Sequence, residues 1–252
     1  MRLGQTEPIP TNRQLELLNR EDWRFHALGP GDTGLLMIAT TERRSKNSKK
    51  LVSFGLPSAP ALYLNLARAA HVRRHSVQSE TMFDEHPGSQ GTWPENHMSL
   101  FDFLEAHAAE VIFSFTAIEA FANESIPKTF RYRTKRREGE VELEGAEIER
   151  QIPLEEKLDR VLPLAHEIRS PKGTAIWHEF TKLKRLRDRL IHLKSIDRRA
   201  SGPEDQTVWG CMLEQQQANH PLTAYRMIGA FPSLIEGRRW YREAGTVIGP
   251  ST

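Results

Sequence analysis

One broad apolar face between residues 104 and 122 constrains this chain more than any other feature of its sequence. Its apolar side chains recur at spacings of three and four, the period with which one side of an α-helix repeats. They are Leu104, Ala108, Val111, Ile112, Phe115, Ile118 and Ala122. With Ser99 as N-cap and Pro127 beyond the end, the pattern predicts a helix over residues 99–124. Because other elements must cover so wide an apolar face, we expect a mainly α-helical fold.

The second half of the chain repeats the helical pattern. A helix is expected over residues 154–168, kinked at Pro163, and another over residues 174–196, where leucines form the apolar stripe. A turn or two of helix is expected over residues 209–218, and a last helix over 221–236, opened by a proline and followed by a glycine. Together these segments predict a bundle of four or five main helices.

The first 98 residues are interpreted as a mixed or irregular extension. We expect four elements within it: a short helix over 12–19, strands over 35–40 and 51–54, and a helix over 61–75. A stretch rich in proline, glycine and polar residues, 81–96, is expected to be a linker. The predicted division is an extension over 1–98, a helical domain over 99–245 and a tail over 246–252.

A highly charged segment separates the first two helices of the predicted domain. Residues 128–149 carry six basic and six acidic side chains, with Glu138 and Gly139 at the expected turn. Aromatic side chains among the arginines offer surfaces on which RNA bases can stack. Opposite charges that pair across two strands explain the composition without a ligand, and we favour a charged β-hairpin insert.

Composition and motifs exclude several classes of protein. With 38% apolar and 27% charged residues the chain is expected to be globular. The longest apolar run is interrupted by Glu119 and is too short to cross a bilayer, and the N-terminus lacks a signal-peptide core, so we expect a soluble, cytoplasmic protein with no membrane partner. The single cysteine, Cys211, excludes an intrachain disulfide. No P-loop, HExxH or paired CxxC motif is present, so neither a metal nor another cofactor is expected.

Positive charge is concentrated in one segment although the formal net charge is only +2. Residues 181–199 contain eight Lys and Arg against two Asp, and include the sequence RLRDRLIHLKS with Arg187 and His192. On a helix Asp188 and His192 lie one turn apart, so the carboxylate is placed to fix the tautomer of the imidazole. Arg187 lies nearer the leucine stripe and cannot easily reach the same atom as His192 from one straight helix. Two copies side by side would bring both side chains to one groove, so we expect a homodimer.

Polar residues also occur on the first predicted helix. Glu119 falls inside its apolar arc, where an unpaired carboxylate is costly, and we expect Arg187 to be its partner. Asn123, one turn later, extends this polar patch. The alternative is an ordinary buried Glu–Arg brace with no catalytic role. His107 and Glu110 share a different face and are expected to form a solvated pair.

These residues carry a resemblance to a known family. RDRLIH resembles the Arg-polar-x-x-x-His motif of HEPN domains, and IEAFANE in the preceding helix resembles the first helix of that family. The resemblance covers residues 99–245, a little over half of the chain. It implies an up-down helical bundle with metal-independent endoribonuclease activity and no cofactor, and a defence or toxin system is one setting for such an enzyme.

The resemblance also implies roles for individual residues. His192 would be the general base or acid at the ribose 2′-hydroxyl or the leaving 5′-oxygen, Arg187 would stabilise charge at phosphorus, and Asp188 would orient His192. Products would end in a 2′,3′-cyclic phosphate. Four basic residues would hold the RNA backbone: Lys184, Arg185, Arg189 and Lys194. Some family members carry a tyrosine two positions after the histidine, which partner enzymes modify. Here that position is Lys194, so control by this route is not expected.

Two functions remain open at this point. The first is a ribonuclease whose partners are RNA, a second copy of the chain, and an antitoxin or regulatory protein. The second is a non-catalytic HEPN-like dimer that binds protein or nucleic acid and uses Arg187 and Glu119 for structure. The two differ in the surroundings of His192, which should be exposed in a positively charged groove in the first case and packed in the second.

Overall fold

The fold was analysed in a computed structural model that describes residues 22–28, 35–45, 48–78, 97–137, 139–198 and 207–249. The helix expected over 12–19 and the linker expected over 81–96 lie outside these ranges. Within them the chain is mainly helical, as the sequence predicts, with short antiparallel strand pairs. No helix in the described ranges is both long enough and apolar enough to cross a membrane.

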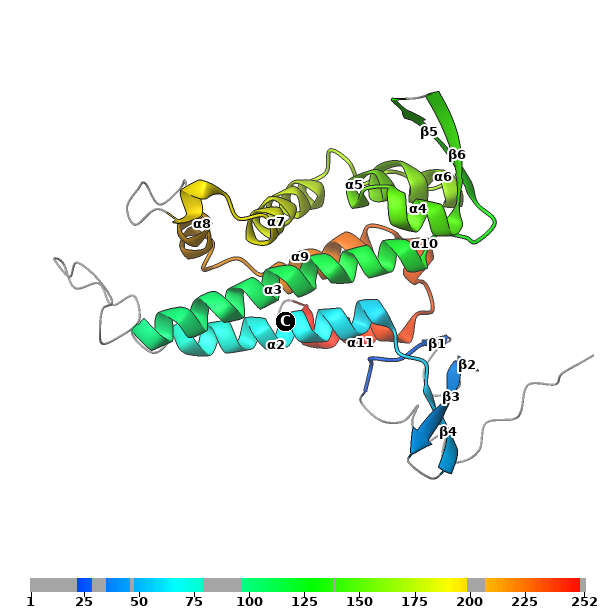
Figure 1. The fold of residues 1–252 in the computed structure, drawn as a ribbon, viewed down its shortest axis with the longest axis horizontal. Helices are drawn as coiled ribbons and strands as arrows, with labels where there is room; N and C mark the ends of the chain where they lie inside the picture. The colour runs from blue at the N-terminus through cyan, green and yellow to red at the C-terminus, as the bar shows by residue number, and fades with distance from the viewer. Residues whose placement is uncertain are drawn as a thin grey trace, which may run out of the picture.

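The central element of the fold is helix α3 (His97–Glu124). Helix α2 (Ala59–Gln78) runs beside it in the opposite direction, as Figure 1 shows. Three further helices also contact α3: α7 (Ala175–Ile191), α8 (Val208–Glu214) and α9 (His220–Gly229). The helix predicted over 99–124 is thus confirmed, and it lies where its wide apolar face can be covered on several sides.

The apolar pattern of α3 is buried as the sequence predicts. Val111, Phe115, Ile118 and Phe121 are almost fully buried and belong to the main hydrophobic core. Ala61 and Leu64 of α2 belong to the same core. The helix expected over 61–75 therefore packs into one unit with the helices that follow residue 97.

The segment predicted as one helix over 154–168 is divided by a π-turn. Helix α5 (Leu154–Glu156) continues into the π-helical segment η2 (Lys157–Val161) and then into α6 (Leu162–His166). Because Pro163 has no backbone N–H, it cannot continue the regular i to i−4 hydrogen bonds, and the turn before it is widened. Before this segment lies α4 (Gly145–Gln151), a helix that the sequence analysis did not predict.

A proline also explains why the C-terminal region differs from its prediction. The single helix expected over 221–236 is wrong, because α9 ends at Gly229 and a separate short helix, α10 (Pro232–Ile235), follows. Pro232 cannot donate the hydrogen bond that would continue α9, and it starts a new helix instead. A further helix, α11 (Arg239–Ile248), packs against α2 and α9 and was not predicted.

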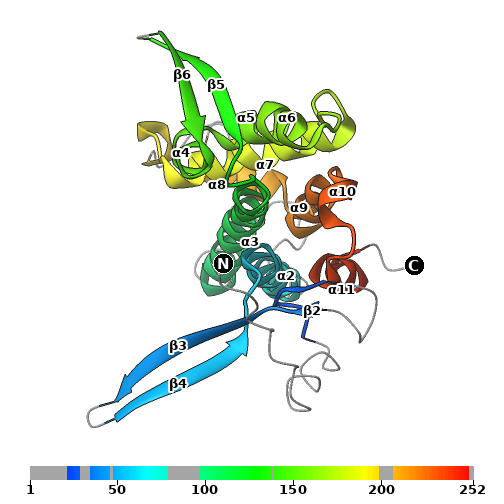
Figure 2. The ribbon, with the colours of Figure 1, turned by 90° about the vertical axis from the view of Figure 1, so that its right-hand side faces the viewer.

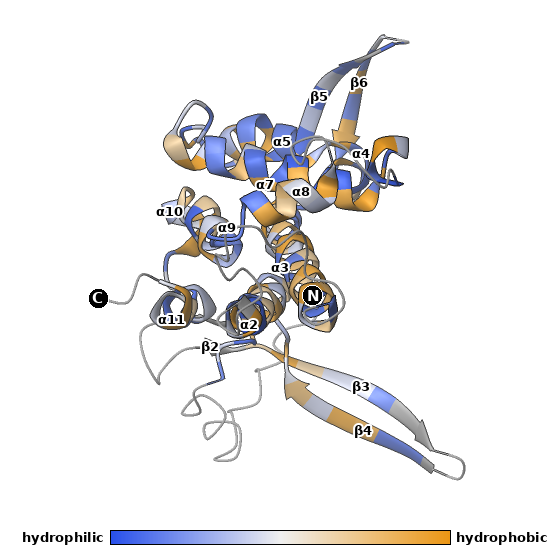
Figure 3. Ribbon diagram, turned by 90° about the vertical axis from the view of Figure 1, so that its left-hand side faces the viewer, coloured by the Kyte–Doolittle hydropathy of each residue, from blue (hydrophilic) through white to orange (hydrophobic). Residues whose placement is uncertain are grey.

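The strands form three antiparallel pairs in the described ranges. Strands β1 (Ala27–Leu28) and β2 (Leu35–Leu36) form a short pair, and β3 (Ile38–Ser45) and β4 (Ser48–Gly55) form a hairpin that projects from the helices (Figure 2). Figure 3 shows hydrophobic residues along β4. Among them, the side chain of Leu51 is 77% exposed.

The charged hairpin expected within residues 128–149 is confirmed. It consists of β5 (Arg131–Arg136) and β6 (Gly139–Glu144). Arg131 pairs with Glu144 and Arg133 with Glu142, each at 2.8 Å, so opposite charges face each other across the two strands. Arg131 and Arg133 therefore have carboxylate partners within the hairpin itself.

A buried ion pair joins α2 to α3. The guanidinium of Arg74 donates from Nε to Glu110 Oε2 at 2.7 Å, and both side chains are fully buried. His71 donates from Nδ1 to the other carboxylate oxygen at 3.0 Å, and the backbone N–H of His220 donates to the same oxygen at 3.1 Å. Burial would raise the pKa of Glu110, but the hydrogen bond from His71 and the charge of Arg74 lower it below its usual value. The solvated pair expected for His107 and Glu110 is therefore wrong.

The same network fixes the loop between α8 and α9. Arg74 also donates to the backbone carbonyls of Gln216 and Ala218, so one buried guanidinium satisfies acceptors from two separate parts of the chain. Fully buried His107 lies with its Nε2 atom 3.1 Å from Nε2 of His220. One of these two nitrogens must donate and the other accept, so the accepting imidazole is neutral, and burial lowers the pKa of both histidines.

We expect the replacement of Arg74 by Met to lower the free energy of unfolding by about 3–5 kcal/mol, because Glu110 would remain buried without its cation. Urea denaturation followed by circular dichroism measures this loss. The matched control is the double variant Arg74→Met with Glu110→Gln, which removes both charges and should lose less. A double variant that loses as much as Arg74→Met alone would show that the ion pair is not the cause.

The two buried histidines should make stability depend on pH. Burial and the nearby charge of Arg74 lower the pKa of His107 from 6.5 to about 3 and that of His220 to about 4. Below about pH 6.5 the unfolded chain therefore binds more protons than the folded one, and the free energy of unfolding should fall as the pH drops from 6.5 towards 4. Urea titrations across this range test the effect. His107→Gln should flatten the profile, and an unchanged slope in that variant would refute the assignment.

Candidate functional site

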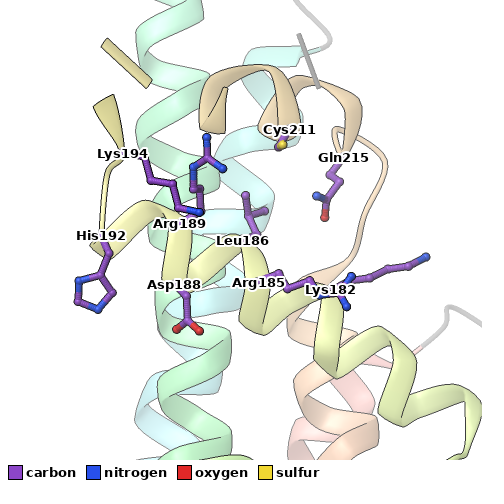
Figure 4. A pocket seen from close by; sticks show the side chains of 9 residues that line it. All are labelled: Lys182, Arg185, Leu186, Asp188, Arg189, His192, Lys194, Cys211 and Gln215. Atoms are coloured by element: carbon purple, nitrogen blue, oxygen red, sulfur yellow. The ribbon is translucent and has the colours of Figure 1, made fainter. Parts of the chain in front are cut away.

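The candidate site is a pocket of about 740 Å³ between the C-terminal half of α7 and helix α8 (Figure 4). Helix α7 is held in place by Phe180, Leu183 and Leu186, which are buried against the core. Its remaining faces carry the polar and charged residues of the basic segment. We call this cavity the α7–α8 pocket, and its lining residues are Lys182, Arg185, Leu186, Asp188, Arg189, His192, Lys194, Cys211 and Gln215.

His192 lies at the end of α7 and not inside it. The helix expected to continue to residue 196 stops at Ile191, and His192 is its C-cap with φ −119° and ψ 66°. Its backbone N–H still donates to the carbonyl of Asp188 at 2.9 Å, while the residue itself is solvent-exposed. The imidazole is therefore placed on the rim of the α7–α8 pocket, where a solute can reach it.

Three cations line this pocket without a carboxylate partner. Among the described residues, no Asp or Glu lies within ion-pair distance of the side chains of Lys182, Arg185 or Lys194. Figure 4 shows Lys182 and Arg185 at the opposite end of the pocket from His192. This arrangement leaves uncompensated positive charge along the pocket, which favours an anionic ligand.

The other two predicted RNA-binding residues already hold ion pairs. Lys184 donates to Asp188 at 2.8 Å and lies 3.4 Å from Glu155, and it does not line the pocket. Arg189 lines the pocket but donates from Nε and from the terminal nitrogen to Asp197, at 2.9 and 2.7 Å. Of the four basic residues, Arg185 and Lys194 are therefore the better placed to bind a phosphate.

Asp197 holds the chain segment that carries His192. In addition to Arg189, it accepts hydrogen bonds from the backbone N–H groups of Lys194 at 2.7 Å and of Val208 at 2.8 Å. These bonds, with that from Arg189 as the largest cause, keep the pKa of Asp197 well below its usual value, so it stays ionised. The turn after α7, including η3 (Ser195–Arg198), is thereby fixed against the start of α8.

Arg187 points away from the α7–α8 pocket. Its guanidinium lies over the ring of Phe115 on α3, 4.8 Å from the ring centroid, and donates to Asp188 Oδ1 at 3.2 Å. It is not among the residues that line the pocket. Within one copy of the chain, Arg187 and His192 therefore face different sides of α7, as the wheel geometry predicts.

Asp188 is occupied by two cations. It accepts hydrogen bonds from Lys184 and Arg187, which lower its pKa although partial burial acts in the opposite direction. In the described structure no hydrogen bond joins its carboxylate to the imidazole of His192. The orienting contact implied by the family resemblance is therefore not formed in this arrangement.

The polar patch on α3 has a partner that the sequence analysis missed. Lys157 is 1% exposed and donates to Asn123 Oδ1 at 2.7 Å and to the carbonyl of Glu149 at 2.6 Å. Burial lowers its pKa, and the negative charge of Glu119 partly offsets this effect. Among the described contacts, Glu119 and Arg187 form no hydrogen bond or ion pair with each other. The cation facing the patch is Lys157, and its position within an otherwise apolar helical face was the signal for it in the sequence.

No group of three or more His, Cys, Asp or Glu side chains within the described ranges is arranged to hold a metal ion. The side chains of His71, His107, Glu110 and His220 lie close together, but they form hydrogen bonds with one another and with Arg74.

Replacing Asp197 by Ala should destabilise the protein by on the order of 3 kcal/mol, because Arg189 and two backbone N–H groups would lose their acceptor. Chemical denaturation measures the loss, and hydrogen exchange should become faster in residues 192–198. The control is Asp102→Ala, since Asp102 forms an exposed ion pair with Arg73 at 2.7 Å and should contribute less than about 1 kcal/mol. Equal losses in the two variants would contradict a structural role for Asp197.

Comparison with protein families, with curated proteins and with solved structures finds no match for this chain. The assignment of a function therefore depends on the residues and geometry described above. Those are an exposed histidine at a helix end, a pocket with uncompensated positive charge, and an arginine directed to the opposite side of the same helix.

Proposed function

We propose that the chain is a cytoplasmic, metal-independent endoribonuclease of the HEPN type, built as an up-down helical bundle. One observation carries the proposal: His192 is exposed on the rim of a pocket of about 740 Å³, and three of the cations that line this pocket have no acidic partner among the described residues. An acid–base group next to a surface that attracts phosphate is the minimum requirement for cleaving RNA without a metal. Such an activity suits a defence or toxin system, in which an antitoxin or other regulatory protein would restrain it.

The reaction uses the substrate's own nucleophile. His192 removes the proton from a ribose 2′-hydroxyl, the 2′-oxygen attacks the adjacent phosphorus, and the bond from phosphorus to the 5′-oxygen breaks. The departing 5′-oxygen takes up a proton, and the other product ends in a 2′,3′-cyclic phosphate. A guanidinium stabilises the charge that develops on the phosphoryl oxygens.

That guanidinium comes from a second copy of the chain. Because Arg187 and His192 face different sides of α7, a two-fold dimer is the arrangement that places both at one phosphate. Ile191 and Leu193 flank His192 and are 48% and 45% exposed, so they supply apolar area for such an interface. The geometry of α7 thus supports a homodimer with the motif helices near its axis.

A second function is favoured by a different observation. Because Asp188 is bound by Lys184 and Arg187, the carboxylate that would orient His192 is engaged elsewhere. A non-catalytic dimer that binds RNA or a partner protein through the α7–α8 pocket needs no oriented imidazole. The two functions share the same fold and surface and differ only in chemistry.

Cleavage of a mixed panel of single-stranded RNAs in the presence of a chelator distinguishes the ribonuclease from the binding module. The wild type should cut RNA under these conditions and leave 2′,3′-cyclic phosphate ends. His192→Ala should lower the rate by about 10²–10⁴-fold without a change in thermal stability. The matched control is His178→Ala, an exposed histidine on α7 that should cut normally. Retained cleavage by His192→Ala, or cleavage that vanishes with chelator, would overturn the mechanism, and a folded wild type that binds but does not cut would favour the binding module.

The same assay tests whether Arg187 of one subunit and His192 of the other form one shared site. Arg187→Gln and His192→Ala should each be inactive alone, whereas a mixture in which subunits exchange should regain part of the wild-type rate, because some heterodimers contain one intact Arg–His pair. No recovery in an exchanged mixture, or a monomer by sedimentation at micromolar concentration, would rule out a shared site.

A further inference from the structure

A second, smaller pocket adjoins the candidate site. It has a volume of about 300 Å³ and lies between α7 and α9, and we call it the α7–α9 pocket. Lys182 and Gln215 line both this pocket and the α7–α8 pocket, so the two cavities are neighbours along one face of α7. Figure 4 shows these two residues at the end of the larger pocket that is remote from His192. A ligand that follows α7 away from His192 therefore reaches the smaller pocket.

The two pockets differ in their polar groups. The α7–α9 pocket contains a carboxylate, Glu179, next to two cations, Lys182 and Arg226. The hydroxyl of Thr223 lies 3.5 Å from Glu179 Oε2, the limit of a hydrogen bond, and no cation within the described ranges forms an ion pair with this carboxylate. A carboxylate repels phosphate, so this pocket does not suit the RNA backbone. It suits a group that offers N–H donors to Glu179 and an acceptor to the cations.

Apolar side chains complete the pocket. Leu183 of α7 and Leu222 of α9 belong to its lining, and Leu183 is part of the hydrophobic core. A flat heterocycle with polar edges can bury its faces against such walls while its edge meets charged groups. Those are the properties of a nucleobase that has been turned out of the stack.

We propose that the α7–α9 pocket binds the base of a nucleotide near the cleaved bond and that the preferred base is guanine. This inference rests on the ribonuclease function proposed above. On its Watson–Crick edge guanine carries two adjacent N–H donors beside a carbonyl oxygen. A carboxylate can accept from both donors while Lys182 or Arg226 donates to the carbonyl. Uracil offers a single N–H donor between two acceptors, and this pattern places an acceptor against Glu179.

The position of the pocket predicts where the preference appears. Lys182 and His192 are ten positions apart, which corresponds to roughly 15 Å at 1.5 Å per helical residue. That distance is longer than one nucleotide, so the selected base is not the one at the cut. Guanine should therefore be enriched at one fixed position a short distance from the cleavage site.

The wall of the pocket is held by hydrogen bonds, two of which involve the fully buried side chains of Glu110 and Arg74. His220 is 4% exposed, and its backbone N–H is fixed by Glu110. Ala218 accepts a hydrogen bond from buried Arg74, and the side chain of Asn219 caps α9 by accepting from the N–H of Leu222 at 2.9 Å. Preorganised walls are what discrimination between bases requires, because a mobile wall adapts to any ligand.

Binding assays with the His192→Ala variant test the proposal without cleavage of the probe. Fluorescence anisotropy would compare a labelled oligouridine with the same oligomer carrying one central guanine. We expect at least about tenfold tighter binding of the guanine oligomer, the lower range for one bidentate contact to a base. Glu179→Gln should reduce this advantage to less than about threefold, and it should not weaken the binding of oligouridine, because it removes a charge that repels phosphate and the acceptors of uracil. Glu236→Gln, an exposed carboxylate outside both pockets, is the matched control and should keep the full advantage.

The possible results distinguish a failure of this inference from a failure of the proposed function. Cleavage-site mapping on a random RNA pool with wild-type protein gives a second measurement in which the guanine position should appear. If RNA is bound and cut without any preference for guanine, or if Glu179→Gln retains the preference, the base pocket is refuted and the ribonuclease stands. If the wild type neither binds nor cuts RNA, the proposed function fails and the inference fails with it.

Discussion

A fully buried ion pair between Arg74 and Glu110 is the constraint on which the arrangement of the helices depends. Two charges removed from water are tolerated only if hydrogen bonds offset much of their desolvation cost, and here the partners come from α2, α3, the α8–α9 loop and the first residue of α9. An apolar core tolerates some sliding of helices, but a hydrogen-bonded network does not. The pair therefore sets the register of α2 on α3 and fixes the start of α9 relative to both.

The cations along α7 fall into two groups with different roles. Some cations are held by carboxylates and serve the structure, as Arg189 does with Asp197, while others, such as Lys182 and Arg185, face a pocket and have no carboxylate partner among the described residues. A local excess of positive charge in the sequence does not reveal which cation belongs to which group. The turn after α7 brings Asp197 back to the helix, where it accepts hydrogen bonds from Arg189 and from the backbone N–H of Lys194. This contact separates Arg189 from the cations of the second group.

The sequence predicts those parts of the fold that depend on local periodicity and charge. The helix over 99–124 and the charged hairpin belong to this class, since each is specified by residues close together in the chain. The end of α7 at Ile191 and the break at Pro232 were missed because a helical pattern of side chains can continue where the backbone does not. The burial of Glu110 was missed because its partner, Arg74, lies in a segment that was assigned to the N-terminal extension.

The order in which the chain acquires its structure follows from how far apart its contacts lie in sequence. Helices α2 and α3 are consecutive, so their pairing closes a short loop and can form early. The bond from Arg74 to Gln216 joins residues 142 positions apart and must wait until most of the chain is in place. The wall shared by the two pockets is thus among the last parts to form. A ligand that bridges α7 and α9 would stabilise this late-forming wall. It would therefore slow the opening of the α8–α9 loop more than the unfolding of the α2–α3 pair.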